Sequence, residues 1–369
     1  MDLALCFKFI SNLSNMKNIM RNFTIAHVVG ARPNFVKLAV VYSKLDEFNQ
    51  LIIHTGQHYD YELSRVFFEE LNIPMPDYNL NVGSGSHGYQ VGEILRRCEK
   101  ILVREEPSLV TVYGDTNSTL AGALATVKLG IPVAHVEAGL RCGLRYMAEE
   151  VNRVLVDHIS ELLFAPTRTA VRNLHAEGIK EGVYFTGDVM LDLFLRYKDR
   201  LFSKEEDFIL ATVHRAENVD DPHRLKAILE ALIECGERVI FPMHPRTRRR
   251  IKEFGFTWFF KARNVKIFKP LGYIKFLRLM ARAEKVITDS GGVQKEAFFM
   301  GKPCITLREV TEWVETVKQG WNILVGTDKI KIINAIRNFR PKSSSDLSVF
   351  GDGRAGEKIA DIIRSKFGL

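Results

Sequence analysis

Short apolar runs alternate with amphipathic segments along most of the chain. The apolar runs are rich in β-branched residues, whereas the segments between them repeat their apolar positions with a helical period. The predicted strands are Thr24–Val29, Leu51–Thr55, Leu109–Tyr113, Pro132–Glu137, Leu162–Pro166, Phe208–Val213, Val239–Met243, Val265–Phe268, Lys285–Thr288, Cys304–Leu307 and Asn322–Gly326. Strands that alternate with helices predict parallel sheets built from βαβ units.

This rhythm starts twice, which predicts two domains. A chain of 369 residues is long enough for two domains of ordinary size. Each half also contains a glycine after a helix followed by a proline ahead of a strand, at Leu129–Val133 and at Met300–Cys304. We therefore predict an α/β fold with two Rossmann-like, doubly wound domains that face a cleft.

Composition and charge narrow the function classes. The chain is 46% hydrophobic and 26% charged, and no apolar run approaches the roughly 20 residues that cross a bilayer, so we expect a cytoplasmic protein without a membrane partner. The five cysteines have neither the paired spacing of a disulfide framework nor that of a zinc site. The net charge of +8 fits either nucleic acid or an anionic small substrate, but no aromatic and basic recognition motif supports the first.

The segments that directly follow the predicted strands are polar. In open α/β sheets ligands bind beyond the carboxyl ends of the strands, so these segments are where chemistry is expected. They are Gly30–Lys37, Gly56–His58, Gly114–Thr119, Glu137–Arg141, His214–Asn218, His244–Thr247 and Asp289–Gly292.

The last of these segments predicts a seat for an anion. Ser290, Gly291 and Gly292 lead from a strand into a helix, whose first N–H groups bind anions while glycines permit close approach. Glu296 follows about one turn later and could accept hydrogen bonds from ribose hydroxyls. The alternative is a plain turn in which Ser290 caps the helix.

Cations near the strand ends could stabilise a departing diphosphate. Arg32 and Lys37 follow the first strand, and Arg215 follows the strand Phe208–Val213. Each of them taken singly also fits a solvated surface charge.

Carboxylates also lie at or just after the ends of predicted strands. Asp115 is either catalytic or a helix cap, whereas Glu137 ends an apolar strand, where a buried charge is costly unless it is paired or used. Glu149 and Glu150 precede Arg153 on a predicted helix, where an intrahelical ion pair is the alternative.

Two histidines have ionisable neighbours at strand ends. His214 stands beside Arg215, and His244 is similarly placed. We expect His27, His135 and His158 to be packing histidines without a chemical role.

Ten motifs taken together resemble the non-hydrolysing UDP-N-acetylglucosamine 2-epimerases. They run in order from about Val28 to Gly326 and read GARPNFVKLAVV, TGQHYD, GDTNSTLAGALA, PVAHVEAGLR, AEEVNR, GDVMLD, TVHRAENVD, HPRT, TDSGGVQKEA and GKP. The resemblance implies a glycosyltransferase-B-like fold. We accordingly expect an N-terminal extension over 1–22 with Met16 or Met20 as alternative starts, a domain with the catalytic carboxylates over 23–187, a UDP-binding domain over 188–352, and a helix over 353–369 that packs on the first domain.

The resemblance also implies the chemistry. UDP leaves across C1 and C2 of UDP-N-acetylglucosamine to give a 2-acetamidoglucal, and it adds back after a proton has returned to the opposite face of C2. The reaction needs neither a nicotinamide cofactor nor a metal, its product serves polysaccharide or glycan biosynthesis, and the enzyme is expected to be a homodimer.

Residue roles follow by the same resemblance. The implied catalytic residues are Asp115, Glu137, Glu149 and His214. The implied substrate-binding and UDP-binding residues are Arg32, Lys37, Arg153, Arg215, His244, Phe276, Ser290, Gly291, Gly292 and Glu296. Gln57 and His58 match positions of an allosteric site.

Departures from the family pattern leave the exact substrate open. Trp313 stands where bacterial members have an arginine that contacts the nucleotide, and Ala148 replaces a proline ahead of Glu149. Relatives that act on UDP-2,3-diacetamido sugar acids share the scaffold, so the C3 and C6 substituents of the sugar stay open. A UDP-sugar glycosyltransferase of the same fold and a hydrolysing epimerase are also compatible with these residues.

Overall fold

The computed structural model describes residues 22–56, 67–201 and 204–369. Almost all of the predicted extension over 1–22 lies outside these ranges, as do Met16 and Met20. Gln57 and His58 also lie outside the described residues.

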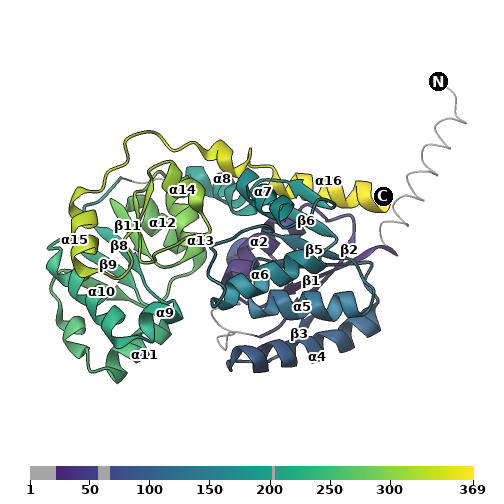
Figure 1. The fold of residues 1–369 in the computed structure, drawn as a ribbon, viewed down its shortest axis with the longest axis horizontal. Coiled ribbons are helices and arrows are strands. Elements are labelled where there is room, and N and C mark those ends of the chain that lie inside the picture. Colours follow the sequence, from purple (N-terminus) through teal and green to yellow (C-terminus); the bar gives the residue numbers. More distant parts are fainter. Residues whose placement is uncertain (1–21, 57–66, 202–203) are drawn as a thin grey trace, which may run out of the picture. The chain divides into compact units, whose positions relative to one another are not determined.

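The chain divides into two compact units, each built around its own sheet (Figure 1). Unit 1 comprises the chain up to Leu193 together with Ser348–Leu369, and unit 2 comprises Phe194–Leu347. Every strand pairing in both sheets is parallel. The predicted α/β class with two doubly wound sheets is confirmed.

Unit 1 holds a seven-stranded sheet in the order β3-β2-β1-β4-β5-β6-β7. Its strands are β1 (Thr24–Val29), β2 (Asn49–His54), β3 (Tyr78–Asn79), β4 (Leu109–Tyr113), β5 (Val133–Val136), β6 (Leu162–Ala165) and β7 (Val183–Phe185). Its helices are α2 (Arg32–Tyr42), α4 (His87–Glu105), α5 (Asn117–Lys128), α6 (Ala148–Ile159), α7 (Arg168–Ala176) and α16 (Ala355–Phe367), with the 3-10 turn η2 (Leu347–Phe350) at its edge. Helix α8 (Val189–Leu201) leads from this unit into the next.

The central strands of unit 1 are apolar because both faces of the sheet are covered. Right-handed crossovers place the helix after β1 and the helix after β4 on opposite faces, since the chain winds outward in opposite directions from these two strands. Both α2 and α5 pack on β1 and β4. Buried side chains such as Val28, Val112 and Leu120 fill the layer between α5 and the sheet.

The C-terminal helix α16 packs on α2 within unit 1. Gly356 allows the close approach, because a Cβ there would lie 2.8 Å from Val40 Cγ1. Lys44 Nζ lies 2.9 Å from Glu357 Oε1, and Asp192 accepts hydrogen bonds from the first N–H groups of α16. These contacts fix the end of the chain beside the helix that follows β1.

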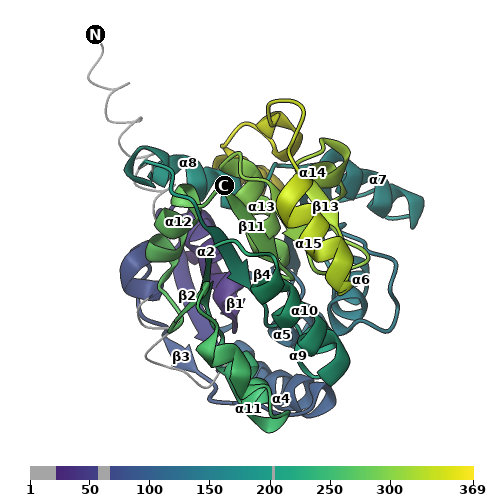
Figure 2. The same ribbon diagram turned by 90° about the vertical axis from the view of Figure 1, so that its left-hand side faces the viewer.

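Unit 2 holds a six-stranded sheet in the order β10-β9-β8-β11-β12-β13. Its strands are β8 (Ile209–Thr212), β9 (Val239–Pro242), β10 (Val265–Phe268), β11 (Lys285–Thr288), β12 (Cys304–Thr306) and β13 (Asn322–Leu324). Its helices are α9 (Ala216–Val219), α10 (Pro222–Glu234), α11 (Pro245–Glu253), α12 (Tyr273–Arg282), α13 (Gly291–Phe299), α14 (Val314–Lys318) and α15 (Lys329–Asn338), with η1 (Thr257–Lys261). Helix α15 lies beside α10 (Figure 2), and their apolar residues complete the core of this unit. Within the ranges that the structure describes, no helix is long and apolar enough to span a membrane.

Candidate active site

Each sheet has one point where the direction of winding reverses. In unit 1 it lies between β1 and β4, and in unit 2 between β8 and β11. Ligands of doubly wound sheets bind beyond the carboxyl ends of the strands at such a point. Four of the predicted polar segments, those after β1, β4, β8 and β11, therefore lie at the two expected positions.

A buried ion pair lies at the reversal point of unit 1. Lys37, on the second turn of α2, pairs with the carboxylate of Glu137, which directly follows β5, and the two residues are only 4% and 8% exposed. Both side chains lie against Gly114, since a Cβ there would be 2.7 Å from Lys37 Nζ and 3.2 Å from Glu137 Oε2. The structure thus brings together a predicted catalytic carboxylate and a predicted diphosphate ligand.

Glu137 adopts a backbone conformation that side-chain-bearing residues rarely take. Its φ is +77°, in the left-handed region. Such a conformation costs about 1–3 kcal/mol and persists where surrounding contacts impose it, often at functional sites. Its N–H donates to Phe164 O at 3.1 Å, which helps to hold it.

Asp115 directly follows Gly114 and pairs with Arg153 of α6. Arg153 is buried, and its Nη1 lies 2.9 Å from Glu150 Oε2. Asn152 on the same helix donates to the Asp115 backbone carbonyl at 2.9 Å. Helix α6 therefore holds Asp115 by both its side chain and its backbone.

The two neighbouring glutamates of α6 differ in their surroundings. Glu150 is buried and accepts hydrogen bonds from Gly143 N at 2.8 Å and Cys142 N at 3.1 Å. The predicted intrahelical ion pair is therefore confirmed between Glu150 and Arg153. The Glu150 carboxylate also fixes the loop ahead of the helix through its two backbone hydrogen bonds. Glu149 is half-buried in the first turn of α6, where its catalytic role stays a prediction.

Arg32 is the first residue of α2, and its guanidinium lies 5.6 Å from the ring centroid of Phe67. Asn34 ties the loop after β1 to the end of β4. Its Oδ1 accepts from Ala31 N at 3.0 Å, and its Nδ2 donates to Tyr113 O at 2.7 Å. Asn34 was not among the predicted site residues, and its amide links the two strands of the reversal point.

Asp289 makes the corresponding link in unit 2. This fully buried carboxylate, at the end of β11, accepts hydrogen bonds from His214 N and Arg215 N, each at 3.0 Å, and from Asn218 Nδ2 at 3.2 Å. The loop after β8 is thereby fixed to the loop after β11. Arg215 is the N-cap residue of α9.

Polar groups of unit 2 gather at the carboxyl ends of the adjacent strands β9, β8 and β11. The rings of His214 and His244 lie with their centroids 5.7 Å apart, and His214 Nδ1 lies 3.6 Å from Asp289 Oδ1. His244 caps α11 by accepting from Arg246 N at 3.1 Å. Ser290 comes just after β11, so the two predicted histidines and the predicted anion seat lie at the carboxyl ends of neighbouring strands.

The predicted anion seat is the N-terminus of α13. Ser290 is the N-cap residue, but its side chain makes no capping hydrogen bond to any residue that the structure describes. Ser290 therefore takes the N-cap position of the alternative without its capping hydrogen bond, and the anion seat stays a prediction. Gly291 and Gly292 are the first two residues of α13, and Glu296 is buried within it.

Side chains from the segment before α14 lie against this helix start. A Cβ on Gly291 would lie 2.3 Å from Glu312 Oε1 and 3.1 Å from Trp313 Nε1, so a larger residue there would displace the Glu312 carboxylate. Glu312 is paired with Arg308 at 2.9 Å, and Lys295 Nζ lies 3.9 Å from the Trp313 ring centroid. Trp313, which departs from the family pattern, is thus buried beside the predicted anion seat.

Phe276 lies in the first turn of α12 after β10 and is half-buried.

Among the histidines without a predicted role, His27 is a buried packing residue, and burial lowers its pKa to about 4. The expectation for His158 is wrong, because His158 lies on the surface of α6.

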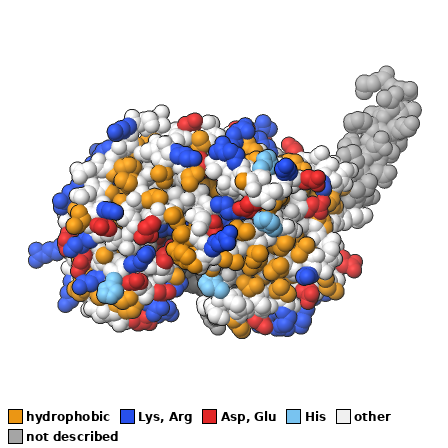
Figure 3. Space-filling view, in the orientation of Figure 1, with side chains coloured by type: hydrophobic (Ala, Val, Ile, Leu, Met, Phe, Trp, Pro, Cys, Tyr) orange, Lys and Arg blue, Asp and Glu red, His pale blue; other side chains and the backbone are white. Residues whose placement is uncertain are grey.

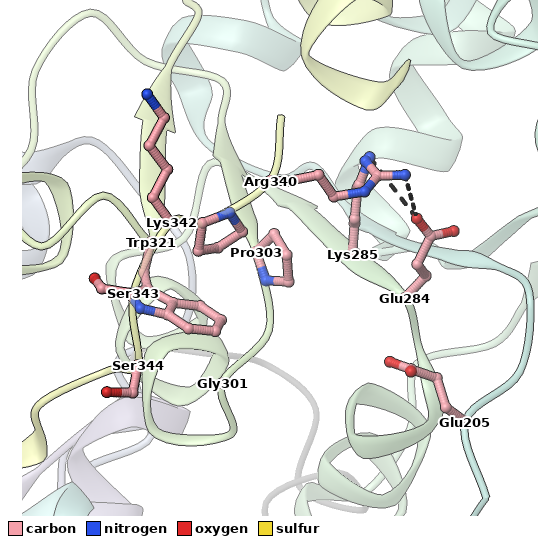
Figure 4. Close-up of a pocket in the computed structure, with 11 residues that line it drawn as sticks. Glu205, Glu284, Lys285, Gly301, Pro303, Trp321, Arg340, Lys342, Ser343 and Ser344 are labelled. Atoms are coloured by element: carbon pink, nitrogen blue, oxygen red, sulfur yellow. Dashed lines mark ion pairs between the residues drawn. The ribbon is translucent and has the colours of Figure 1, made fainter. Parts of the chain in front are cut away.

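A cavity of about 490 Å³ lies in unit 2 away from these residues (Figure 4). Lys285, Pro303 and Trp321 line it, and they stand at the beginnings of β11, β12 and β13, at the opposite edge of the sheet. Its Arg340 is paired with Glu284 at 3.0 Å. Its lining includes none of the predicted site residues, so it is not the candidate site. No cluster of His, Cys, Asp and Glu within the described ranges could hold a metal ion.

Comparisons with known proteins agree on one family. A family model described as UDP-N-acetylglucosamine 2-epimerase matches residues 42–364. A "UDP-N-acetylglucosamine 2-epimerase homolog" of Methanococcus maripaludis is 52% identical over 354 residues, which cover 92% of this chain and 99% of the relative. The UDP-2,3-diacetamido-2,3-dideoxy-D-glucuronate 2-epimerase of Pseudomonas aeruginosa is 46% identical with the same coverage of both chains.

A solved structure is similar over the same span. The crystal structure of Methanocaldococcus jannaschii UDP-GlcNAc 2-epimerase in complex with UDP-GlcNAc and UDP matches with a TM-score of 0.88 and 46% identity, covering 93% of this chain and 100% of that chain. The chain therefore belongs to the UDP-N-acetylglucosamine 2-epimerase family.

Proposed function

We propose that this protein interconverts UDP-N-acetylglucosamine and UDP-N-acetylmannosamine by reversible epimerisation at C2, without hydrolysing the nucleotide sugar. The observation that carries the proposal is the pair of cation-bound carboxylates, Glu137 with Lys37 and Asp115 with Arg153, at the reversal point of unit 1. Family membership supports the reaction, and the M. jannaschii relative was solved with UDP-GlcNAc and UDP bound.

The carboxylates of unit 1 suit the proton transfers. The hydrogen on C2 has no adjacent carbonyl and is weakly acidic, so its removal must accompany loss of a stabilised leaving group. One carboxylate takes this proton while the bond between C1 and the UDP oxygen breaks, which leaves a 2-acetamidoglucal. A proton then returns to the opposite face of C2 as UDP adds back to C1, so atoms balance without a cofactor.

Unit 2 supplies the groups that suit the departing UDP. The helix start at Ser290, Gly291 and Gly292 presents backbone N–H groups, and His214 and Arg215 stand on the adjacent loop. Donors fixed in advance stabilise a charge that develops in the transition state.

The experiment that tests the proposal is proton NMR of UDP-N-acetylglucosamine incubated with the protein in deuterated water. Elimination and re-addition predict deuterium at C2 of both epimers. Epimer formation without deuterium at C2 would reject the mechanism. Release of free N-acetylmannosamine would instead indicate a hydrolysing enzyme, and a requirement for a sugar acceptor would indicate a glycosyltransferase.

A second substrate is favoured by one relative. The P. aeruginosa protein named for UDP-2,3-diacetamido-2,3-dideoxy-D-glucuronate is 46% identical to this chain, and an M. jannaschii UDP-N-acetylglucosamine 2-epimerase is 47% identical. We rank the second substrate below UDP-N-acetylglucosamine because similar structures from M. jannaschii and Neisseria meningitidis were solved with UDP-GlcNAc bound. Competition between equal concentrations of the two UDP-sugars, followed by kcat/KM for each, decides between them.

Replacing Gly291 by alanine is expected to weaken UDP binding by about tenfold or more, since the added Cβ would collide with Glu312 Oε1 at the helix start. Titration calorimetry with UDP measures the change. Gly92→Ala on α4 is the matched control, because a Cβ at Gly92 meets no atom within 4 Å. An unchanged affinity in Gly291→Ala would contradict the assigned seat.

We also propose that two copies of the chain associate through α5 and α6. Hydrophobic side chains gather over these helices (Figure 3). Val127 of α5 and Val151 and Leu155 of α6 are 38%, 42% and 45% exposed. Leu155→Glu is therefore expected to halve the mass measured by light scattering, because a charge would be buried in the interface. Ile330→Glu on α15, also exposed, serves as the control that keeps the dimer mass. A monomeric wild-type protein would contradict this assembly.

A further inference from the structure

His135 has no role in the proposed reaction, yet it lies among charged groups in the centre of unit 1. It is a fully buried residue of β5, two positions before Glu137. Its Nδ1 lies 2.7 Å from Asp157 Oδ1, and its Nε2 lies 2.7 Å from the backbone carbonyl oxygen of Gly114. Both ring nitrogens therefore face oxygen atoms.

These contacts determine the protonation of the ring. A carbonyl oxygen only accepts, so Nε2 must carry a proton. Asp157 also accepts from Gly139 N at 3.0 Å and from Arg141 Nη1 at 2.7 Å. The Arg141 guanidinium, as a permanent cation in direct contact, favours the carboxylate form of Asp157. The carboxylate form of Asp157 accepts as well, so Nδ1 must carry the second proton.

We propose that His135 is a buried imidazolium that, with Asp157, positions the two loops carrying Asp115 and Glu137. This inference rests on the proposed function for its kinetic consequences. His135 holds the Gly114 carbonyl, the acceptor one residue before Asp115. Asp157 holds Gly139 N, two residues after Glu137.

The surrounding charges stabilise this ion pair in its buried setting. Arg141 also donates to Glu177, with Nε 2.7 Å from Oε1 and Nη2 2.6 Å from Oε2. The cations His135 and Arg141 and the anions Asp157 and Glu177 therefore have a net charge of zero. A buried charge is tolerated when it is paired and its remaining donors are satisfied.

The backbone held by this pair includes the strained residue Glu137 and two glycines that adopt a positive φ without strain. Gly114, Glu137 and Gly139 all have positive φ, at +67°, +77° and +80°. A Cβ at Gly139 would lie 2.4 Å from Ala170 O, so this turn is also tightly enclosed. Strained conformations persist only where several contacts over-determine them, and His135 and Asp157 supply contacts to both turns.

Helix α6 joins the two carboxylate systems. Arg153 and Asp157 are four residues apart, so they share one face of the helix. Arg153 pairs with the Asp115 carboxylate, and Asp157 pairs with His135. Helix α6 thus positions the side chain of Asp115 through Arg153, and the backbone ahead of Asp115 through Asp157 and His135.

The first test is nitrogen NMR of the full-length protein at pH 7.5. His135 is identified as the signal lost in His135→Gln, and both of its ring nitrogens are expected to carry a proton. In Asp157→Asn, an isosteric change, one of these two proton signals is expected to disappear. A His135 ring with one proton in the wild type would overturn the inference, whether or not the protein epimerises either UDP-sugar.

The second test is kinetic and separates positioning from general stability. His135→Gln and Asp157→Asn are each expected to lower kcat by about tenfold or more, while KM and the Kd for UDP change less than about twofold. His27→Gln is the matched control, because His27 is equally buried on β1, two strands away, and its ring nitrogens are hydrogen-bonded to the neutral groups Tyr113 Oη and Gln50 Oε1. It is expected to lower Tm and to leave kcat within twofold.

Two kinetic outcomes would overturn the positioning role. One is a His135→Gln variant with a lower Tm and unchanged kcat, as His27→Gln is expected to show. The other is a parallel loss of UDP affinity in both His135→Gln and Asp157→Asn, which would indicate a general structural defect. A wild type that turns over neither UDP-sugar would reject the proposed function separately, and the NMR result would then decide the ion pair.

Discussion

Replacing Glu137 by glutamine is expected to lower kcat for C2 epimerisation by about 10²–10⁴-fold, the range typical of general acid–base catalysis. The amide has the same shape but cannot accept the proton from C2. The affinity for UDP is expected to fall far less than kcat, because Lys37 keeps its charge and the predicted seat at the start of α13 belongs to unit 2. Deuterium incorporation at C2 measures the first effect, and titration calorimetry measures the second.

The same substitution affects stability, and this effect must be separated from catalysis. Lys37 would lose its carboxylate partner in a buried position, and breaking a buried ion pair costs about 3–5 kcal/mol. Glu137→Gln combined with Lys37→Met removes both charges and is expected to recover part of the Tm without recovering kcat.

A matched control removes an ion pair elsewhere in unit 1. Glu47 lies 2.6 Å from Arg364 where α16 packs beside α2, and Glu47→Gln is expected to leave kcat unchanged. Recovery of kcat together with Tm in the double variant would show that Glu137 has a structural role only.

The positions of the site loops could be predicted from the sequence, because they follow from the strands alone. Each of the predicted strands is present, and the polar segments after β1, β4, β8 and β11 lie at the reversal points. Two edge strands were missed. β3 has only Tyr78–Asn79, and β7 has only Val183–Phe185, so neither is long enough to show a period of two.

The partners of the site residues could not be predicted in the same way. Lys37 and Glu137 are 100 residues apart, and they meet only because β1, β4 and β5 are neighbours in the sheet. Strand order is a tertiary property that a local pattern of apolar residues does not contain. The approach of Glu312 to Gly291 depends in the same way on the packing of separate segments.

Other features were readable from the sequence and were overlooked. Glu150, Arg153 and Asp157 repeat at helical spacing with the apolar Val156, so the buried face of α6 includes Glu150 rather than Glu149. Asp289 ends an apolar strand as Glu137 does, and the same argument about the cost of a buried charge applies to it. Applying that argument to every strand end would have found the carboxylate that organises unit 2.

Replacing Asp289 by asparagine is expected to weaken UDP binding by more than about tenfold and to lower the stability of unit 2. Both carboxylate oxygens accept from backbone or amide N–H groups, at His214, Arg215 and Asn218. An asparagine amide would direct an NH₂ group at some of these donors. Each buried donor left unsatisfied costs about 1–3 kcal/mol, so the loop after β8 is expected to move away from the end of β11.

The control for Asp289→Asn must be a carboxylate that also caps a helix but does not hold the site. Asp221 is suitable, because it accepts from His223 N at 2.8 Å and Arg224 N at 3.1 Å at the start of α10. Asp221→Asn is expected to change stability by about 1 kcal/mol or less and to leave UDP affinity unchanged, since asparagine is also a good N-cap. Titration calorimetry and thermal unfolding of both variants give the comparison. If Asp289→Asn lost stability but kept its affinity for UDP, then the loop carrying His214 and Arg215 would not contribute to nucleotide binding, and the assignment of unit 2 as the UDP-binding half would rest on α13 alone.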